Sequence, residues 1–284
     1  MPAPRLLSPT VTVVTRARPG HASQDRHLIL ANAVAVLDGA TSSDFPVGRD
    51  AAWYADLLIG PIATHLSETQ LALSDVVEAA IARTATQYEL VSGASPSSTV
   101  TMLRWTDDAS PIEALVLADS PLVVRYLDGT TEVHCDNRID HCAAQLQNAY
   151  RTRLAAGSGY DADHARLMRD LGAFLRTGRN QPGGFWVAEA DPRAAQEAVA
   201  LSLDPQRVQD AAILTDGASA AVDLYGLFPD WATALDLMRD DGPDALLEAV
   251  RQAEATDPDG RHWPRAKVHD DATAVYLDFT AGRA

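Results

Sequence analysis

The chain has 284 residues, of which 46% are hydrophobic and 22% charged, so it can bury a substantial core and is not predominantly disordered. Its formal charge of -16 gives an average surface that repels phosphate backbones, so we expect no nucleic-acid partner. No run of about 18 apolar residues occurs, and the start of the chain has no long apolar stretch. We therefore expect a cytoplasmic protein with no membrane partner.

The first third of the chain predicts strands followed by two helices. Alternating β-branched residues predict a strand at Thr10–Val14, and the apolar runs His27–Ala31 and Ala33–Leu37 predict a hairpin. Apolar residues at helical spacing then predict a helix within residues 47–66. Ser74 is interpreted as the N-cap of a second helix.

The middle of the chain predicts three consecutive strands, in residues 98–105, 112–120 and 122–127. Residues 140–177 carry a helical pattern rich in Arg, Ala and Leu, which is interpreted as a helical insertion or flap. Strand character resumes in residues 184–190.

The last elements are a strand that ends on Asp216, two short helices and a final strand, in residues 210–217, 230–238, 243–255 and 270–279. Strands thus come in runs interrupted by helical pairs rather than in strict alternation with helices. This order favours an α+β fold with antiparallel sheets and helices on their faces. A single domain over residues 1–284 is predicted.

Aspartates recur beside the ends of predicted strands. Asp38 and Asp216 each follow an apolar run and precede Gly-Ala, Asp270 lies at the start of the final strand, and Asp25 precedes the hairpin. Carboxylates at the rim of a sheet can converge, and oxygen ligands without thiolates suit Mg²⁺ or Mn²⁺. Gly39 would let its own carbonyl approach an ion. The alternative is that Asp-Gly is a common turn dipeptide and marks only turns.

The two cysteines do not indicate a structural metal site. Cys135 and Cys142 are each adjacent to a histidine, His134 and His141, rather than spaced as Cys-x-x-Cys. We expect reduced, partly buried thiols.

Six short motifs follow one another between Gly20 and Asp278. They are Gln-Asp, VLDG, SSTV, ADSPLVV, TDG and DDATAV, at residues 24–25, 36–39, 97–100, 118–124, 215–217 and 270–275. Together and in this order they resemble the metal-dependent serine/threonine protein phosphatases of the 2C type, in a bacterial form. The likeness covers nearly the whole chain.

This resemblance implies a four-layer sandwich of two antiparallel β-sheets flanked by α-helices, with a metal centre at one end. Two Mg²⁺ or Mn²⁺ ions are implied, and a third is left open. Asp38 would bridge the two ions and the Gly39 carbonyl would bind one of them. The other ion would be held by Asp216 and Asp270, and Asp25 would act through a water molecule.

The implied activity is removal of phosphate from phosphoserine or phosphothreonine in proteins through a metal-activated water, since two cations lower the pKa of a shared water. Two alternatives remain open: the same chemistry on a small phosphorylated metabolite, and a non-catalytic phosphatase-like binding module. A further alternative is an acidic structural domain without activity, in which the Asp-Gly pairs only form turns.

Some positions depart from the family's pattern. Gly20 stands where the family has an arginine that grips the substrate phosphate. Arg18 and His21 are the nearby candidates, so the phosphate-binding residue is left unassigned. Ala118 replaces a glycine before Asp119, and Asp119 is interpreted first as a residue that stabilises a turn.

Overall fold

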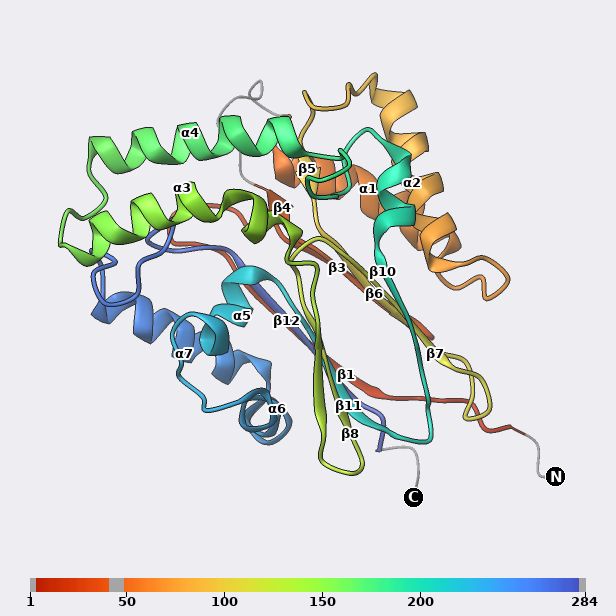
Figure 1. Cartoon of the computed structure of the whole chain (residues 1–284). Coiled ribbons are helices and arrows are strands. Elements are labelled where there is room, and N and C mark those ends of the chain that lie inside the picture. The colour runs from red at the N-terminus through yellow and green to blue at the C-terminus, as the bar shows by residue number, and fades with distance from the viewer. Residues whose placement is uncertain (1–3, 41–48, 281–284) are drawn as a thin grey trace.

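The computed structural model describes residues 4–40 and 49–280, and two five-stranded antiparallel sheets form its centre (Figure 1). Sheet I has the strand order β1 (Thr10–Arg16), β12 (Ala272–Asp278), β11 (Val208–Leu214), β8 (Leu122–Tyr126) and β9 (Thr131–His134). Sheet II has the order β10 (Val199–Leu203), β7 (Ile112–Leu117), β6 (Val100–Arg104), β3 (Ala33–Leu37) and β2 (Arg26–Leu30). A short pair, β4 (Gly39–Ala40) with β5 (Ser97–Ser98), continues beyond β3.

Strand β3 shows how the layers are made. All five of its residues are buried, and successive side chains of a strand point to opposite faces. Ala33, Ala35 and Leu37 belong to the core beneath two helices, whereas Val34 and Val36 belong to the core between the sheets. A continuous apolar run is therefore required here, because neither face of the strand meets water.

Helices cover both outer faces, which confirms the predicted four-layer α+β sandwich. On sheet II lie α1 (Ala51–His65) and α2 (Leu73–Tyr88). On sheet I lie α5 (Asp216–Asp223), α6 (Trp231–Asp240) and α7 (Pro243–Thr256). A short 3₁₀ helix, η1, spans Pro192–Glu197. None of the helices in the described part of the chain is long and apolar enough to span a membrane.

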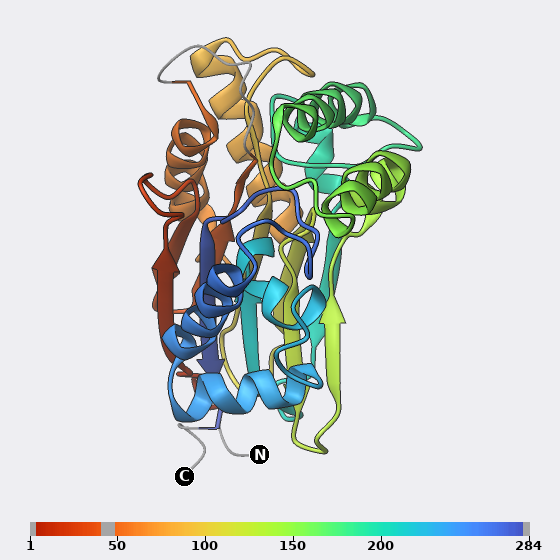
Figure 2. The same cartoon turned by 90° about the vertical axis from the view of Figure 1, so that its left-hand side faces the viewer.

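A further helical pair, α3 (Arg138–Ala155) and α4 (Ala162–Gly178), connects the strands of sheet I to the second half of the chain. The two helices pack on each other at one end of the sandwich rather than on an outer face (Figure 2). They lie where residues 140–177 predicted helices. That this pair is a flap within one domain spanning residues 1–284 stays a prediction.

Three local predictions were wrong. Helix α2 begins at Leu73 with Ala72 at its N-cap and no capping side chain, so Ser74 lies in the first turn. Residues 184–190 form only isolated bridges, because Gly184 packs so tightly against Gly178 that the segment turns instead of extending. Asp216 does not end a strand but starts α5, because the small residues after it continue as a helix.

Candidate metal centre

Antiparallel pairing brings the four predicted aspartates to one end of the sandwich. In sheet II the start of β2 pairs with the end of β3, so Asp25 and Asp38 lie at the same end. In sheet I the end of β11 lies beside the start of β12, which places Asp216 and Asp270 together. Four sequence segments thus meet because the end of each antiparallel strand adjoins the start of its neighbour.

A pair of threonine hydroxyls joins the two sheets at this end. Thr215 Oγ1, directly after β11, and Thr273 Oγ1 of β12 donate hydrogen bonds of 3.1 and 2.8 Å to Oδ2 of Asp25, which precedes sheet II. Asp25 is only 3% exposed, and its other oxygen, Oδ1, is buried without a hydrogen-bond partner. A buried carboxylate oxygen without a partner costs free energy, so binding a cation or accepting a hydrogen bond from a water molecule would stabilise this atom.

The last residue of β5, Ser98, and the residue after it, Thr99, fix the backbone of Asp38. Its amide donates to Thr99 Oγ1 at 3.0 Å, and its carbonyl accepts from Ser98 Oγ and the Thr99 amide, both at 2.9 Å. Thr99 Oγ1 also bonds the hydroxyl of buried Ser120 at 2.7 Å. The SSTV motif therefore acts by holding Asp38 in place.

The aspartates repel one another. Burial, followed by the charge of Asp216, raises the pKa of Asp25 to about 7 against the two hydroxyls that stabilise its anion. Burial and the charges of Asp216, Asp25 and Asp270 raise the pKa of Asp38 well above its usual range. Burial and Asp216 raise the pKa of Asp270 to about 6, although Lys267 opposes the shift. Asp216 itself is exposed. A positive charge bound among these carboxylates would stabilise their ionised forms.

The donor set fits a hard divalent cation, because it consists of carboxylate and backbone oxygens. Asp38, Asp216 and Asp270 are the side chains that would hold such ions. Within residues 4–40 and 49–280, however, no three His, Cys, Asp or Glu side chains are grouped as ligands of one ion. Lys267 Nζ instead lies 2.8 Å from both carboxylate oxygens of Asp270. The carboxylates are thus gathered at one end of the fold without being closed around a common point.

Asp271, next to Asp270, has a different role that the sequence did not reveal. It is buried and accepts the backbone N–H groups of Arg18 at 2.8 Å and Gln24 at 3.0 Å. It therefore anchors the loop that leads to Asp25. Arg251 supports the same junction by donating to the carbonyl oxygen of Asp270 at 2.6 Å.

The loop before Asp25 also contains the candidate phosphate-binding residues. Gly20, at the position where an arginine was expected, has a φ of +79°, a conformation that residues with a side chain rarely adopt. Arg18 is half-buried, and its Nε is buried without a hydrogen-bond partner. His21 is exposed, and Arg16 is paired with Asp244 and Glu248 of α7.

Asp119 belongs near the cluster rather than only to a turn. Burial, followed by the charge of Asp216 and assisted by Asp140 and Asp136, raises its pKa to about 7. The preceding residue, Ala118, has a φ of +71°, the conformation for which glycine is preferred. The Ala-Asp-Ser motif is the sequence signal for this position.

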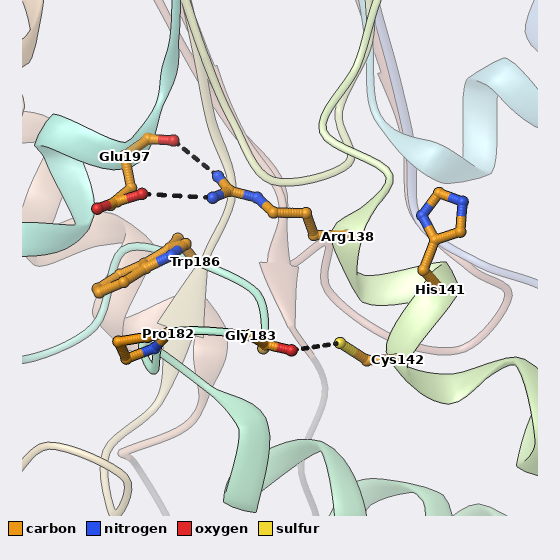
Figure 3. A pocket seen from close by; sticks show the side chains of 8 residues that line it. Arg138, His141, Cys142, Pro182, Gly183, Trp186 and Glu197 are labelled. Carbon is orange, nitrogen blue, oxygen red and sulfur yellow. Dashed lines mark hydrogen bonds and ion pairs between the residues drawn. The ribbon is translucent and has the colours of Figure 1, made fainter.

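A separate hollow of about 420 Å³ lies between α3 and the turn after α4 (Figure 3). It is lined by Arg138, His141, Cys142, Pro182, Gly183, Gly184, Trp186 and Glu197. Arg138 closes one side by donating to the carbonyl oxygen of Glu197 at 2.7 Å. None of the predicted metal ligands lines it. Cys135 and Cys142 are both half-buried and form no disulfide.

No protein-family model and no curated protein sequence matches the chain, whereas solved structures match its fold. The serine/threonine phosphatase MsPP from Mycobacterium smegmatis, in complex with cacodylate, has a TM-score of 0.55 at 15% identity, with 95% of this chain and 98% of that chain covered. The catalytic domain of the serine/threonine phosphatase PstP, in complex with two manganese ions, has a TM-score of 0.56 at 15% identity, with 96% and 98% covered.

The serine/threonine phosphatase Stp1 from Staphylococcus aureus has a TM-score of 0.58 at 12% identity, with 98% of this chain and 97% of that chain covered. At such identities the likeness establishes the fold. The chain therefore has the fold of the metal-dependent 2C-type phosphatases over nearly its whole length, as its motifs predicted.

Proposed function

We propose that the protein is a Mg²⁺- or Mn²⁺-dependent phosphomonoester hydrolase that removes phosphate from phosphoserine and phosphothreonine in proteins. The observation that carries this proposal is the convergence of Asp25, Asp38, Asp216 and Asp270 from separate segments to one end of the sandwich. Burial and the neighbouring negative charges raise the pKa values of three of them, Asp25, Asp38 and Asp270. Strongly perturbed carboxylates that share a site are typical of functional centres. The fold shared with phosphatases, one of them in complex with two manganese ions, supports the same conclusion.

Held by Asp38, Asp216 and Asp270, divalent ions would supply an attacking water of lowered pKa and positive charge for the phosphoryl oxygens. Asp25 is suited to orient a water molecule, because the two threonines fix one of its oxygens and leave Oδ1 unpaired. A cysteine nucleophile is disfavoured. Burial and the charge of Asp119 raise the pKa of Cys135 to about 12, so its thiol stays protonated.

Arg18 is the side chain we assign to the substrate phosphate. Its backbone is anchored by Asp271, beside Asp270, and its buried Nε lacks a partner. A guanidinium suits phosphate because it offers several donors in one plane. Arg18→Met should raise KM for a phosphopeptide by roughly tenfold or more, the cost of one charged hydrogen bond. Arg16→Met is the matched control, because Arg16 is engaged by α7 and should leave KM unchanged.

The proposed function is tested by hydrolysis of a chromogenic aryl phosphate. Turnover should require Mn²⁺ or Mg²⁺ and should be lost in Asp38→Ala and in Asp216→Ala. Tight metal binding without turnover would instead identify a binding module, and the absence of both would leave an acidic structural domain. Phosphopeptides compared with phosphorylated metabolites then identify the substrate class, and a strong preference for metabolites would refute the protein-phosphatase assignment.

A bacterial origin and a cytoplasmic location belong to this proposal. The bacterial source of the similar phosphatases supports the first. The two cysteines that form no disulfide support the second, since reducing compartments keep thiols unpaired.

A further inference from the structure

Lys267 is the only lysine in the 284-residue sequence, and every other side chain of the Lys/Arg class is an arginine. It precedes Asp270 by three residues and lies in the carboxylate cluster. A lysine ammonium is a compact point charge on a flexible stem, whereas a guanidinium is a broad planar fork. At this one position the chain therefore carries the side chain that most nearly resembles a small spherical cation.

The Lys267 ammonium is in direct contact with the carboxylate of Asp270. Its Nζ lies 2.8 Å from Oδ1 and from Oδ2 of Asp270. Burial disfavours the charged ammonium, yet the negative charges of Asp270, Asp216 and Asp38 together raise its pKa above the usual value. These three aspartates are the side chains that would hold the divalent ions.

The segment that carries Lys267 is firmly held. Asp257 accepts the backbone N–H groups of Arg261 and Trp263, both at 2.9 Å, and pairs with the Arg265 guanidinium at 3.1 Å. His164 of α4 contacts the carbonyl oxygen of Ala266 at 2.9 Å. The backbone is thus fixed by many contacts, so movement of the ammonium requires only rotation of its four-carbon stem.

We propose that Lys267 is a tethered cation that neutralises the carboxylate cluster in the metal-free protein and competes with a divalent ion for Asp270. The ammonium lies 2.8 Å from both carboxylate oxygens of Asp270, so an ion that binds either oxygen from the same side must displace it. The lysine thereby stabilises the metal-free fold and weakens metal affinity. This inference rests on the proposed metal-dependent function and deepens it.

The test compares Lys267→Met with the wild-type protein by calorimetric titration with Mn²⁺ and by thermal unfolding in a chelator. The variant should bind Mn²⁺ roughly tenfold more tightly, which is the scale of one partly desolvated charge pair, and its metal-free form should unfold several degrees lower. Arg261→Met is the matched control. It removes one positive charge from an exposed position of the same segment and should change neither measurement.

Lys267→Arg keeps the positive charge and should bind Mn²⁺ nearly as the wild-type protein does. This variant separates the effect of the charge from the effect of the side-chain shape, and it serves if Lys267→Met folds poorly. Equal or weaker Mn²⁺ binding by Lys267→Met would overturn the competition while leaving the proposed function intact. A wild-type protein that binds no Mn²⁺ would overturn the proposed function, and the competition with it.

The single lysine allows a direct observation. Reductive methylation with ¹³C-formaldehyde labels only Lys267 and the α-amino group, and the labelled amines keep their charge. Saturating Mg²⁺ should shift the Lys267 signal and leave the terminal signal in place. An unchanged Lys267 signal at a Mg²⁺ concentration that saturates the protein would contradict the displacement.

Discussion

The backbones of Gly217 and Asp271 are packed so closely that a Cβ at residue 217 would lie 2.0 Å from the carbonyl oxygen of Asp271. Asp216 and Asp270 are neighbours because this position has no side chain. Gly39 plays a similar part, since a Cβ there would lie 2.9 Å from the carbonyl oxygen of Gln24, beside Asp25. Neither glycine has a positive φ. The glycine of each Asp-Gly pair therefore serves close packing of two segments rather than a left-handed turn.

Gly217→Ala should consequently damage the candidate metal centre through the backbone. The added methyl group meets a carbonyl oxygen that cannot rotate away, so we expect a loss of about 2–3 kcal/mol of unfolding free energy, typical of overpacking. The unfolding temperature should fall by roughly 5–10 °C in a chain of this size. Mn²⁺ affinity should fall as well, since Asp216 and Asp270 are pushed apart.

Gly60→Ala is the control for that substitution. Gly60 lies inside α1, and no heavy atom lies within 4 Å of a Cβ placed there. Alanine is favoured over glycine within a helix by about 1 kcal/mol, so Gly60→Ala should match or exceed wild-type stability. A Gly217→Ala protein as stable as Gly60→Ala would refute the close-packing argument.

The positions of the aspartates were predictable because their signals are local. Asp38 follows an apolar strand and precedes glycine, and that pattern is visible within five residues. The partners that organise the cluster were not predictable, because they act across the chain. Asp271 bonds the backbones of Arg18 and Gln24, 253 and 247 residues away, and no local pattern announces such contacts.

Two of the edge strands, β9 and β10, were missed for a related reason. Strand β9 has no fully buried residue, and β10 has only one, Leu203, so neither shows the continuous apolar run that identified β3. Their pairing with β8 and β7 is decided by the sheets that they join. Lys267 is similar, since only the fold reveals that the sole lysine lies among carboxylates.

Asp38→Asn should affect stability and activity in opposite directions. Burial, together with repulsion within the cluster, raises the pKa of Asp38, so its anion destabilises the metal-free fold at alkaline pH. The neutral amide should raise the metal-free unfolding temperature at pH 8 by a few degrees, corresponding to about 1 kcal/mol. Mn²⁺-dependent hydrolysis should fall at least a hundredfold. Reduced metal-free stability in this variant would contradict a destabilising Asp38 anion.

The metal-free protein should lose stability as the pH rises toward neutrality. Asp25 and Asp119 have pKa values of about 7, and Asp270 of about 6, all above the value of about 3.9 for unfolded aspartate. The folded state therefore binds more protons than the unfolded state between these limits. Their stabilising contribution is complete below about pH 4 and is lost by about pH 7.

Thermal unfolding of the metal-free protein between pH 5 and pH 8 measures this dependence. We expect a decline with rising pH in chelator and a much flatter profile in saturating Mg²⁺, because a bound cation stabilises the ionised carboxylates. The increase in unfolding temperature caused by Mg²⁺ should accordingly be larger at pH 8 than at pH 5. An equal increase at both values would indicate that these carboxylates do not bind the ion.

Adjacent aspartates should respond differently to the same substitution. Asp271 accepts a backbone N–H on each of its oxygens, and an asparagine offers only one acceptor, so Asp271→Asn leaves one buried N–H unpaired. That loss costs about 1–3 kcal/mol of unfolding free energy. Mn²⁺ affinity should stay within about threefold of wild type, which is under 1 kcal/mol. Asp270→Asn removes a proposed ligand and should weaken Mn²⁺ binding at least tenfold.

Calorimetric titration with Mn²⁺ and thermal unfolding of Asp270→Asn and Asp271→Asn distinguish a residue that binds the ion from one that holds the loop in place. The wild-type contacts explain why the roles separate: Asp270 is only half-buried and faces Lys267, whereas Asp271 is buried and faces the loop before Asp25. If Asp271→Asn lost Mn²⁺ binding while keeping its stability, the two roles would be exchanged. The ion would then lie on the loop side of the junction, beside Arg18, and away from Lys267.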